Sequence, residues 1–303
     1  MRVLFLLLAL VAQSFAAGSL VALRSEQAAL PESISREAFA AIDRACDSLR
    51  ESLGTNSVWQ GADTAPTTIP AAALSEPEDP APELTAALAA VERSCTKPWT
   101  RNETMDAVFA VLGASFAGTN VSETIVARLS HVRPESLPVA DATLTLLALD
   151  AVGADTTEGW ERLAGRPLPA EPTLDSIMPL ALARQSRAFR RTGSMEPTPD
   201  LVAYLRWLSP KLRLAFRADL PDGDADPVGI SPETAFFTAV VASRLPSRFL
   251  VRGEGAGIPY NWRNHLANRI LASQVWMDGF GFGWEPDLRA TTEGILALRM
   301  IAQ

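Results

Sequence analysis

Apolar residues recur along most of this chain at the three-to-four spacing that marks one face of a helix. The first clear run is SISREAFAAIDRACDSLRESLG, in which Ile34, Ala38, Ile42 and Leu49 share a face and Gly54 follows the run. Segments that alternate apolar and polar residues, as strands do, are scarce. Several runs also begin with a capping residue followed by proline. The pattern therefore predicts an all-α protein.

Two kinds of helix alternate in this pattern. Strongly apolar segments occupy six places, at 67–74, 103–114, 142–151, 175–184, 233–244 and 291–300. Amphipathic or charged helices are expected between them, near 35–53, 82–95, 121–132, 156–165, 199–217 and 262–274. A helix that is apolar nearly all round has to be buried, whereas a helix with one apolar stripe faces solvent on its other side.

Six such hairpins predict an (α/α)6 toroid with inner and outer helices, because an open array without capping repeats leaves apolar end faces in water. An open superhelical solenoid is the structural alternative.

The N-terminal sequence MRVLFLLLALVAQSFAAG predicts a signal peptide over residues 1–17. Arg2 precedes an apolar run, and small residues follow that run at the positions that a signal peptidase reads. The run is shorter than the roughly 20 apolar residues needed to span a bilayer, and no later segment is long and apolar enough to do so. We expect residues 18–303 to form a single exported domain, periplasmic or secreted.

Charge and cysteine content narrow the possible partners and cofactors. The net charge is -8 and the arginines are scattered, which disfavours binding to nucleic acid or to an anionic membrane. The only two cysteines, Cys46 and Cys95, are expected to form a disulfide in an oxidising compartment. Short-spaced clusters of metal ligands do not occur, so no metal or other cofactor is expected.

One acidic stretch, DGDADPVGISPE at 222–233, spaces four carboxylates as a calcium loop does. It has Pro227 where such a loop needs glycine, so capping roles are favoured for its acids.

The stretch QVWMDGFGFGW carries a resemblance to a known family. Gln274, Asp278, Gly279 and Trp284 precede a helix that begins with Thr291, and an Asp-Gly pair also stands at 222–223. This pattern resembles the prenyltransferase and squalene cyclase-like repeat superfamily over residues 215–303. The resemblance implies an α/α toroid in which these four residues form a structural clasp between hairpins: Asp-Gly for a tight turn, Gln capping helix ends and Trp supplying buried area.

Three further aromatic residues, Trp276, Phe280 and Phe282, lie within the same stretch. We expect them to fill the gap between helix ends, with a role in lining a ligand mouth as the alternative.

Two groups of residues suggest catalysis. Asp141, in PVADAT, is similar in placement to the starting acid of class II terpene cyclases, but the expected supporting carboxylates are replaced at 139 and 142. A capping or helix-dipole role is therefore preferred for it. Tyr260, Arg263 and His265, in PYNWRNH, have the residue types of a toroidal polysaccharide lyase, which needs a charge neutraliser and a general base. Neighbours on one helix point in different directions, so packing and solvation are the preferred roles here too.

The zinc ligands of protein prenyltransferases are missing, because no cysteine follows position 95. The sequence as a whole favours a non-catalytic binding or scaffolding module of the bacterial envelope. Its partner is expected to be an envelope protein or a small apolar or carbohydrate ligand. A polysaccharide lyase is the second hypothesis and a terpene cyclase-like enzyme the third.

Overall fold

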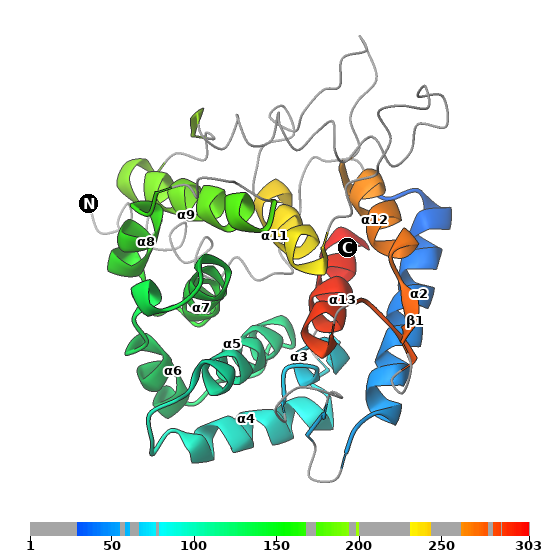
Figure 1. Ribbon diagram of the computed structural model, residues 1–303, viewed down its shortest axis with the longest axis horizontal. Coiled ribbons are helices and arrows are strands. Elements are labelled where there is room, and N and C mark those ends of the chain that lie inside the picture. The colour runs from blue at the N-terminus through cyan, green and yellow to red at the C-terminus, as the bar shows by residue number, and fades with distance from the viewer. Residues whose placement is uncertain are drawn as a thin grey trace, which may run out of the picture. The chain divides into compact units, whose positions relative to one another are not determined.

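The computed structural model describes residues 29–54, 58–60, 67–76, 79–167, 174–193, 198–199, 231–243, 262–277, 281–285 and 287–302 (Figure 1). These residues belong to two compact units. The first unit includes 52–163, and the second unit combines 29–51 with 164–302, each with the gaps just given. The predicted signal peptide and nearly all of the predicted helix at 199–217 lie outside the described residues.

The first unit consists of helices that succeed one another along the chain. They are α3 (Ala71–Leu74), α4 (Pro82–Ser94), α5 (Arg101–Phe116), α6 (Glu123–Ser130), the 3-10 helix η1 (Pro134–Ser136), α7 (Val139–Ala151) and α8 (Thr157–Ala164), whose last residue belongs to the second unit. Helix α5 packs against α3, α4 and α7, and α6 contacts α4, α5 and α7 (Figure 1). The apolar helices α5 and α7 are thus direct neighbours.

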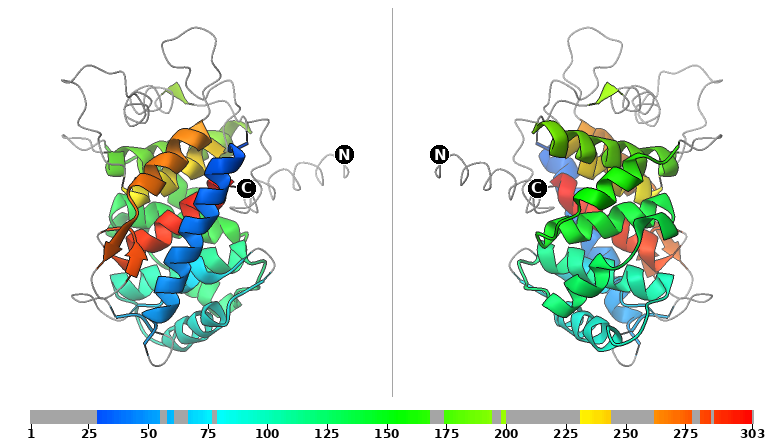
Figure 2. Two further views of the ribbon diagram at one scale, coloured as in Figure 1. Left: turned by 90° about the vertical axis from the view of Figure 1, so that its right-hand side faces the viewer. Right: turned by 90° about the vertical axis from the view of Figure 1, so that its left-hand side faces the viewer.

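The second unit joins a helix from early in the chain to the C-terminal helices. It contains α2 (Glu32–Glu51), α9 (Leu174–Thr192), α11 (Pro232–Ser243), α12 (Trp262–Ala272), β1 (Val275–Met277), β2 (Gly281–Gly283) and α13 (Leu288–Ala302). Helix α11 contacts both α9 and α13, and α13 also packs against α2 and α12 (Figure 2).

The two kinds of helix that the sequence predicts differ in how many of their residues are buried. Every residue of α5 from Ala107 to Ala114 is buried, and so is every residue of α13 from Ala290 to Ile301. In contrast, the amphipathic helix α6 buries only Ile125 and Leu129. The all-α prediction is therefore confirmed for the described residues, apart from one short hairpin.

A glycine and an aspartate position the short helix α3 against α5. A Cβ atom at Gly113 would lie 2.7 Å from the Cα of Ala72, so only glycine lets the two helices approach this closely. Nearby, the carboxylate of Asp106 accepts hydrogen bonds from the Thr67 hydroxyl at 2.6 Å and from the Thr68 amide at 2.8 Å. These contacts hold the segment that leads into α3.

The aromatic stretch before α13 forms a two-stranded antiparallel hairpin, which the helical pattern does not predict. Trp276 pairs with Phe282 across the strands, and their rings meet edge to face with centroids 5.0 Å apart. On the opposite face, Gly281 is so close to α2 that an added Cβ would lie 2.5 Å from the Ser48 hydroxyl oxygen. Because side chains alternate along a strand, this close approach turns the aromatic rings outward.

The expectation that these aromatic residues fill a gap between helix ends is wrong for Trp276, which is 65% exposed. Phe282 is 36% exposed, and Phe280 lies outside the described residues.

Candidate ligand-binding site

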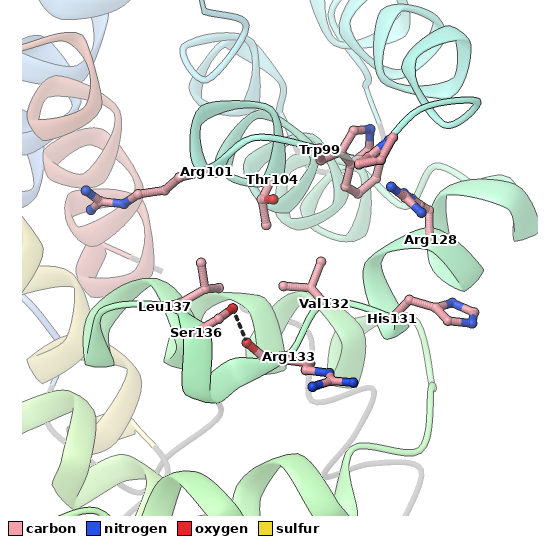
Figure 3. Close-up of a pocket in the computed structure, with 10 residues that line it drawn as sticks. Trp99, Arg101, Thr104, Arg128, His131, Val132, Arg133, Ser136 and Leu137 are labelled. Atoms are coloured by element: carbon pink, nitrogen blue, oxygen red, sulfur yellow. Dashed lines mark hydrogen bonds between the residues drawn. The ribbon is translucent and has the colours of Figure 1, made fainter.

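A pocket of about 440 Å³ opens in the first unit where three segments meet. The segment leading into α5, the C-terminal end of α6 and the turn containing η1 supply its lining (Figure 3). The lining residues are Pro98, Trp99, Arg101, Thr104, Arg128, His131, Val132, Arg133, Ser136 and Leu137. A volume of this size lies within the range of about 300–1,000 Å³ that is typical of small-molecule sites.

The pocket has an apolar interior and a basic rim. Figure 3 shows Val132, Leu137 and Thr104 pointing into the space between the segments, while Arg133 and His131 point outward at its edge. Arg128 lies beside Trp99 on one side. Such a division suits a ligand with an apolar body and a polar head.

Trp99 and Arg128 are held in place by the protein itself. The Trp99 indole Nε1 donates to the Ser94 hydroxyl at 2.8 Å and to the Ser94 carbonyl at 3.2 Å. The Arg128 guanidinium lies 5.8 Å from the centroid of the Trp99 ring and donates to the Lys97 carbonyl at 2.8 Å. The indole and the guanidinium are therefore positioned before any ligand arrives.

The start of α5 is fixed just as firmly. Thr100 and Glu103 form a capping box, in which the Thr100 hydroxyl accepts from the Glu103 amide and the Glu103 carboxylate accepts from the Thr100 amide. Lys97 forms an ion pair with Glu103 at 2.8 Å. Hydrogen bonds from Lys97 and then from Thr100 lower the pKa of Glu103 to about 2. The carboxylate is thus ionised throughout the physiological range and keeps this edge of the pocket in shape.

Asp141 takes part in an ion pair next to the pocket. It lies in the first turn of α7, is 1% exposed, and accepts from the Arg101 Nε at 2.6 Å. This position in the first turn suits the predicted helix-dipole role, whereas the N-cap of α7 is Pro138; the ion pair also links the start of α5 to the start of α7.

The other predicted catalytic residues do not line this pocket. Arg263 and His265 lie on α12 in the second unit, and Tyr260 lies outside the described residues. Arg263 is buried, donates to the Ile301 carbonyl at 3.4 Å, and has its pKa lowered by burial. His265 is half-buried on the same helix. The described contacts of Arg263 are those of a packed helix residue.

Two of the four predicted clasp residues lie among the described ones. The Gln274 side chain donates to the Ala41 carbonyl at 2.8 Å and accepts from Arg44 at 2.9 Å, so it joins the end of α12 to α2. The Trp284 ring is fully buried, and its Nε1 donates to the Ile270 carbonyl at 2.8 Å. These are contacts that a clasp between hairpins would make.

Asp278 and Gly279, the other two predicted clasp residues, lie outside the described residues. The clasp role of all four residues stays a prediction.

The predicted disulfide is wrong, because Cys46 and Cys95 do not form a disulfide in the structure. Cys46 is buried on α2 of the second unit, whereas Cys95 caps α4 of the first unit and donates from Sγ to the Val91 carbonyl at 3.4 Å. Burial first and Glu92 second raise the pKa of the Cys95 thiol, against the charge of Arg128. Each thiol is thus accommodated within the packing of its own unit.

Sequence reasoning missed the pocket because its residues come from three loop and helix-end segments. The spacing of Trp99, Arg128 and Arg133 along the chain matches no sequence motif. The available signal was the predicted hairpin pattern itself, which places the start of the helix at 103–114 near the end of the helix at 121–132. A tryptophan and several arginines at those ends would then have suggested a shared site.

We compared the chain with models of protein families, with curated proteins and with solved structures, and none of them matches it. The resemblance of residues 215–303 to the prenyltransferase and squalene cyclase-like superfamily therefore stays a prediction. Among the described residues, no group of three or more His, Cys, Asp or Glu side chains is arranged to hold a metal ion. The described helices include none with both the length and the apolarity to cross a membrane.

Proposed function

We propose that this protein is an exported helical repeat protein of the bacterial envelope that binds a small ligand and does not transform it. The observation that carries the proposal is the pocket of the first unit, with its apolar interior, its basic rim and its fixed tryptophan. The sequence features of a signal peptide support export to the periplasm or beyond.

The internal bonding of the lining supports binding as the role of this pocket. Trp99, Arg128 and the start of α5 are all held by hydrogen bonds within the first unit. A site that is ordered in advance loses less conformational entropy when a ligand binds, so more of the contact energy appears as affinity. A surface hollow between flexible side chains would lack this property.

We also propose that the helices close into the (α/α)6 toroid predicted from the sequence. Within the first unit, the apolar helices α5 and α7 pack together, and within the second unit, α11 packs against α9 and α13. Neighbouring apolar helices of this kind are what an inner ring requires. The open solenoid has the same local contacts, so small-angle scattering of the full chain in solution would distinguish the two arrangements.

A second candidate function, contact with another envelope protein, is favoured by the aromatic hairpin. Trp276 and Phe282 are both exposed, and the Arg44 guanidinium lies 5.7 Å from the centroid of the Phe282 ring. Exposed aromatic residues beside an arginine are enriched at protein interfaces. This surface belongs to the second unit, so it can be tested independently of the pocket.

The ligand-binding proposal is tested by native mass spectrometry of protein purified gently from the envelope fraction of its own host. We expect wild-type protein to carry a small molecule and Val132→Trp, which fills the pocket, to lose it. Ala127→Trp is the matched control, because residue 127 is exposed on α6 and does not line the pocket. Wild-type protein without any bound small molecule, or equal retention in Val132→Trp, would contradict the proposal.

A further inference from the structure

We infer that the ligand of this pocket is a small organic anion, in which a carboxylate, phosphate or sulfate group is attached to an apolar body. This inference rests on the proposed function, since it specifies what the pocket binds. It follows from three features of the lining: its charge, its apolar interior and the bonding of its hydroxyl groups.

The charge of the lining is opposite to that of the whole chain. The protein has a net charge of -8, yet this pocket is lined by three arginines and a histidine, and its lining includes no aspartate or glutamate. Asp141 forms an ion pair with Arg101 and offsets its charge. Among the described residues, Arg128 and Arg133 form no ion pair with a carboxylate, so these two guanidinium groups supply the positive charge of the rim.

Two further carboxylates lie close to the lining, and Glu103 is already paired with Lys97. Glu135 forms an ion pair with Arg162 at 3.0 Å. A hydrogen bond from its own backbone, followed by the charges of Arg162 and Arg133, lowers the pKa of Glu135. Because Arg162 already contacts Glu135, the rim keeps an excess of positive charge that favours an anion.

The apolar interior requires more than a bare inorganic anion. Val132 and Leu137 point into the space, and the half-buried Trp99 ring bounds it. A phosphate or sulfate ion alone would leave these surfaces in water, whereas an apolar body attached to the anion would cover them. The size of the pocket suits such a ligand.

The hydroxyl groups of Thr104 and Ser136 donate their hydrogens within the protein and so offer no donor to a neutral sugar. The Thr104 hydroxyl donates to the Thr100 carbonyl at 2.8 Å, and the Ser136 hydroxyl donates to the Arg133 carbonyl at 2.8 Å. Recognition of a neutral sugar relies on several free donors and acceptors around its ring. Here the guanidinium groups at the rim are the main charged donors of the lining, and their preferred acceptors are oxyanions.

Isothermal titration calorimetry on the full mature chain tests this inference with a matched set of probes. The set is 2-naphthoate, 2-naphthyl phosphate, neutral 2-naphthamide and inorganic phosphate. We expect both naphthyl anions to bind, and we expect 2-naphthamide and inorganic phosphate to bind at least about tenfold more weakly. Comparison of the two anions identifies which head group the site prefers.

Arg133→Gln is the main variant, because residue 133 is exposed and none of the described hydrogen bonds involves its side chain. It should weaken 2-naphthoate about tenfold through loss of a charge-assisted hydrogen bond. Arg93→Gln removes the same charge from an exposed position on α4 outside the pocket and should leave the affinity unchanged.

Three results would overturn the inference. Equal affinity for 2-naphthamide would remove the requirement for an anion, and equal affinity for inorganic phosphate would remove the requirement for an apolar body. No binding of any probe would also overturn it. None of these results tests the proposed function. That function is tested separately, by whether wild-type protein from the host retains a small molecule that Val132→Trp loses.

Discussion

At the scale of single residues, one arginine of the second unit is shared by two glutamates. Arg289 forms ion pairs at 2.8 Å with both Glu233 on α11 and Glu293 on α13. Glu293 is buried, and burial raises its pKa to about 8, although the charge of Arg289 acts in the opposite direction. Arg289 supplies one positive charge for two carboxylates, so a proton shared between Glu233 and Glu293 leaves the three groups without net charge.

This arrangement predicts how stability depends on pH. A carboxylate whose pKa is raised in the folded state binds its proton more tightly there than in the unfolded chain. Its contribution is therefore complete below the ordinary value of 4.5 and is lost as the pH rises to about 8. We expect Glu293→Gln to flatten the fall in the free energy of unfolding between these values, measured by urea denaturation at several pH values. Glu285→Gln, at an exposed position, is the control and should show the same decrease in the free energy of unfolding as the wild type. An equally steep decrease in Glu293→Gln would contradict the raised pKa of Glu293.

The predicted clasp role of Trp284 can also be tested with single substitutions. Its ring is buried, its indole donates to the Ile270 carbonyl, and its amide donates to the Thr291 hydroxyl at 3.0 Å. Truncation of a buried tryptophan typically costs about 3–5 kcal/mol, so Trp284→Ala should lower the melting temperature strongly. Trp276→Ala, in the same hairpin region but 65% exposed, should change it little. Similar melting temperatures for the two variants in calorimetry would refute the clasp role.

At the scale of elements, the hydrophobic pattern predicts the helices because the residues that a helix buries recur along the sequence with the helical period. The predicted runs at 82–95, 103–114, 142–151 and 291–300 all correspond to described helices, and the apolar ones are buried on nearly every side. The hairpin at 275–283 was not predictable in this way, since three-residue strands are too short to show alternation. Gly281 lets the hairpin lie against Ser48 of α2, and the Phe282 amide donates to the Ser48 hydroxyl, contacts that only the tertiary structure supplies.

The helical pattern alone was not enough to predict the pocket. The pattern identifies which helix faces are buried and which helix ends lie near one another, but it does not show which side chains at those ends line a common space. Trp99, Arg128 and Leu137 come together only when α5, α6 and the turn before α7 have packed. Motifs in the sequence therefore indicate Asp141 and His265 and not these three residues.

The contact between α3 and α5 gives a prediction at this scale. Replacing glycine by alanine within an exposed helix normally stabilises it by up to about 1 kcal/mol. Gly113→Ala should do the reverse, because the new methyl group would lie 2.7 Å from the Ala72 backbone and 3.0 Å from its Cβ, neither of which is a flexible side-chain end. We expect a loss of about 1–3 kcal/mol in the free energy of unfolding, measured by urea denaturation. Unchanged or increased stability would show that α3 moves away from α5 without cost.

At the scale of the whole molecule, the export proposal makes a prediction about the mature chain. If residues 1–17 form a signal peptide, the protein from the host envelope fraction should begin at or near Ala17 or Gly18. Intact-mass measurement and N-terminal sequencing check this directly. A chain that retains Met1 in that fraction would contradict cleavage.

Two surfaces of the molecule are candidates for the site that binds its partner or ligand. The pocket belongs to the first unit and has a basic rim, whereas the exposed aromatic hairpin belongs to the second unit. The composition of the sequence alone gives no preference between them. The indole and guanidinium favour the pocket, because hydrogen bonds within the protein hold both groups in place.

Hydrogen exchange measures which of the two surfaces binds a small molecule. The full mature chain is measured with and without the small-molecule fraction released by heat from protein purified from its own host. The same fraction from a mock purification is the control. We predict slower exchange of backbone amides in 97–104 and 128–137, with no change in 275–283. Protection of the hairpin in place of the pocket, or no difference from the mock fraction, would contradict the account.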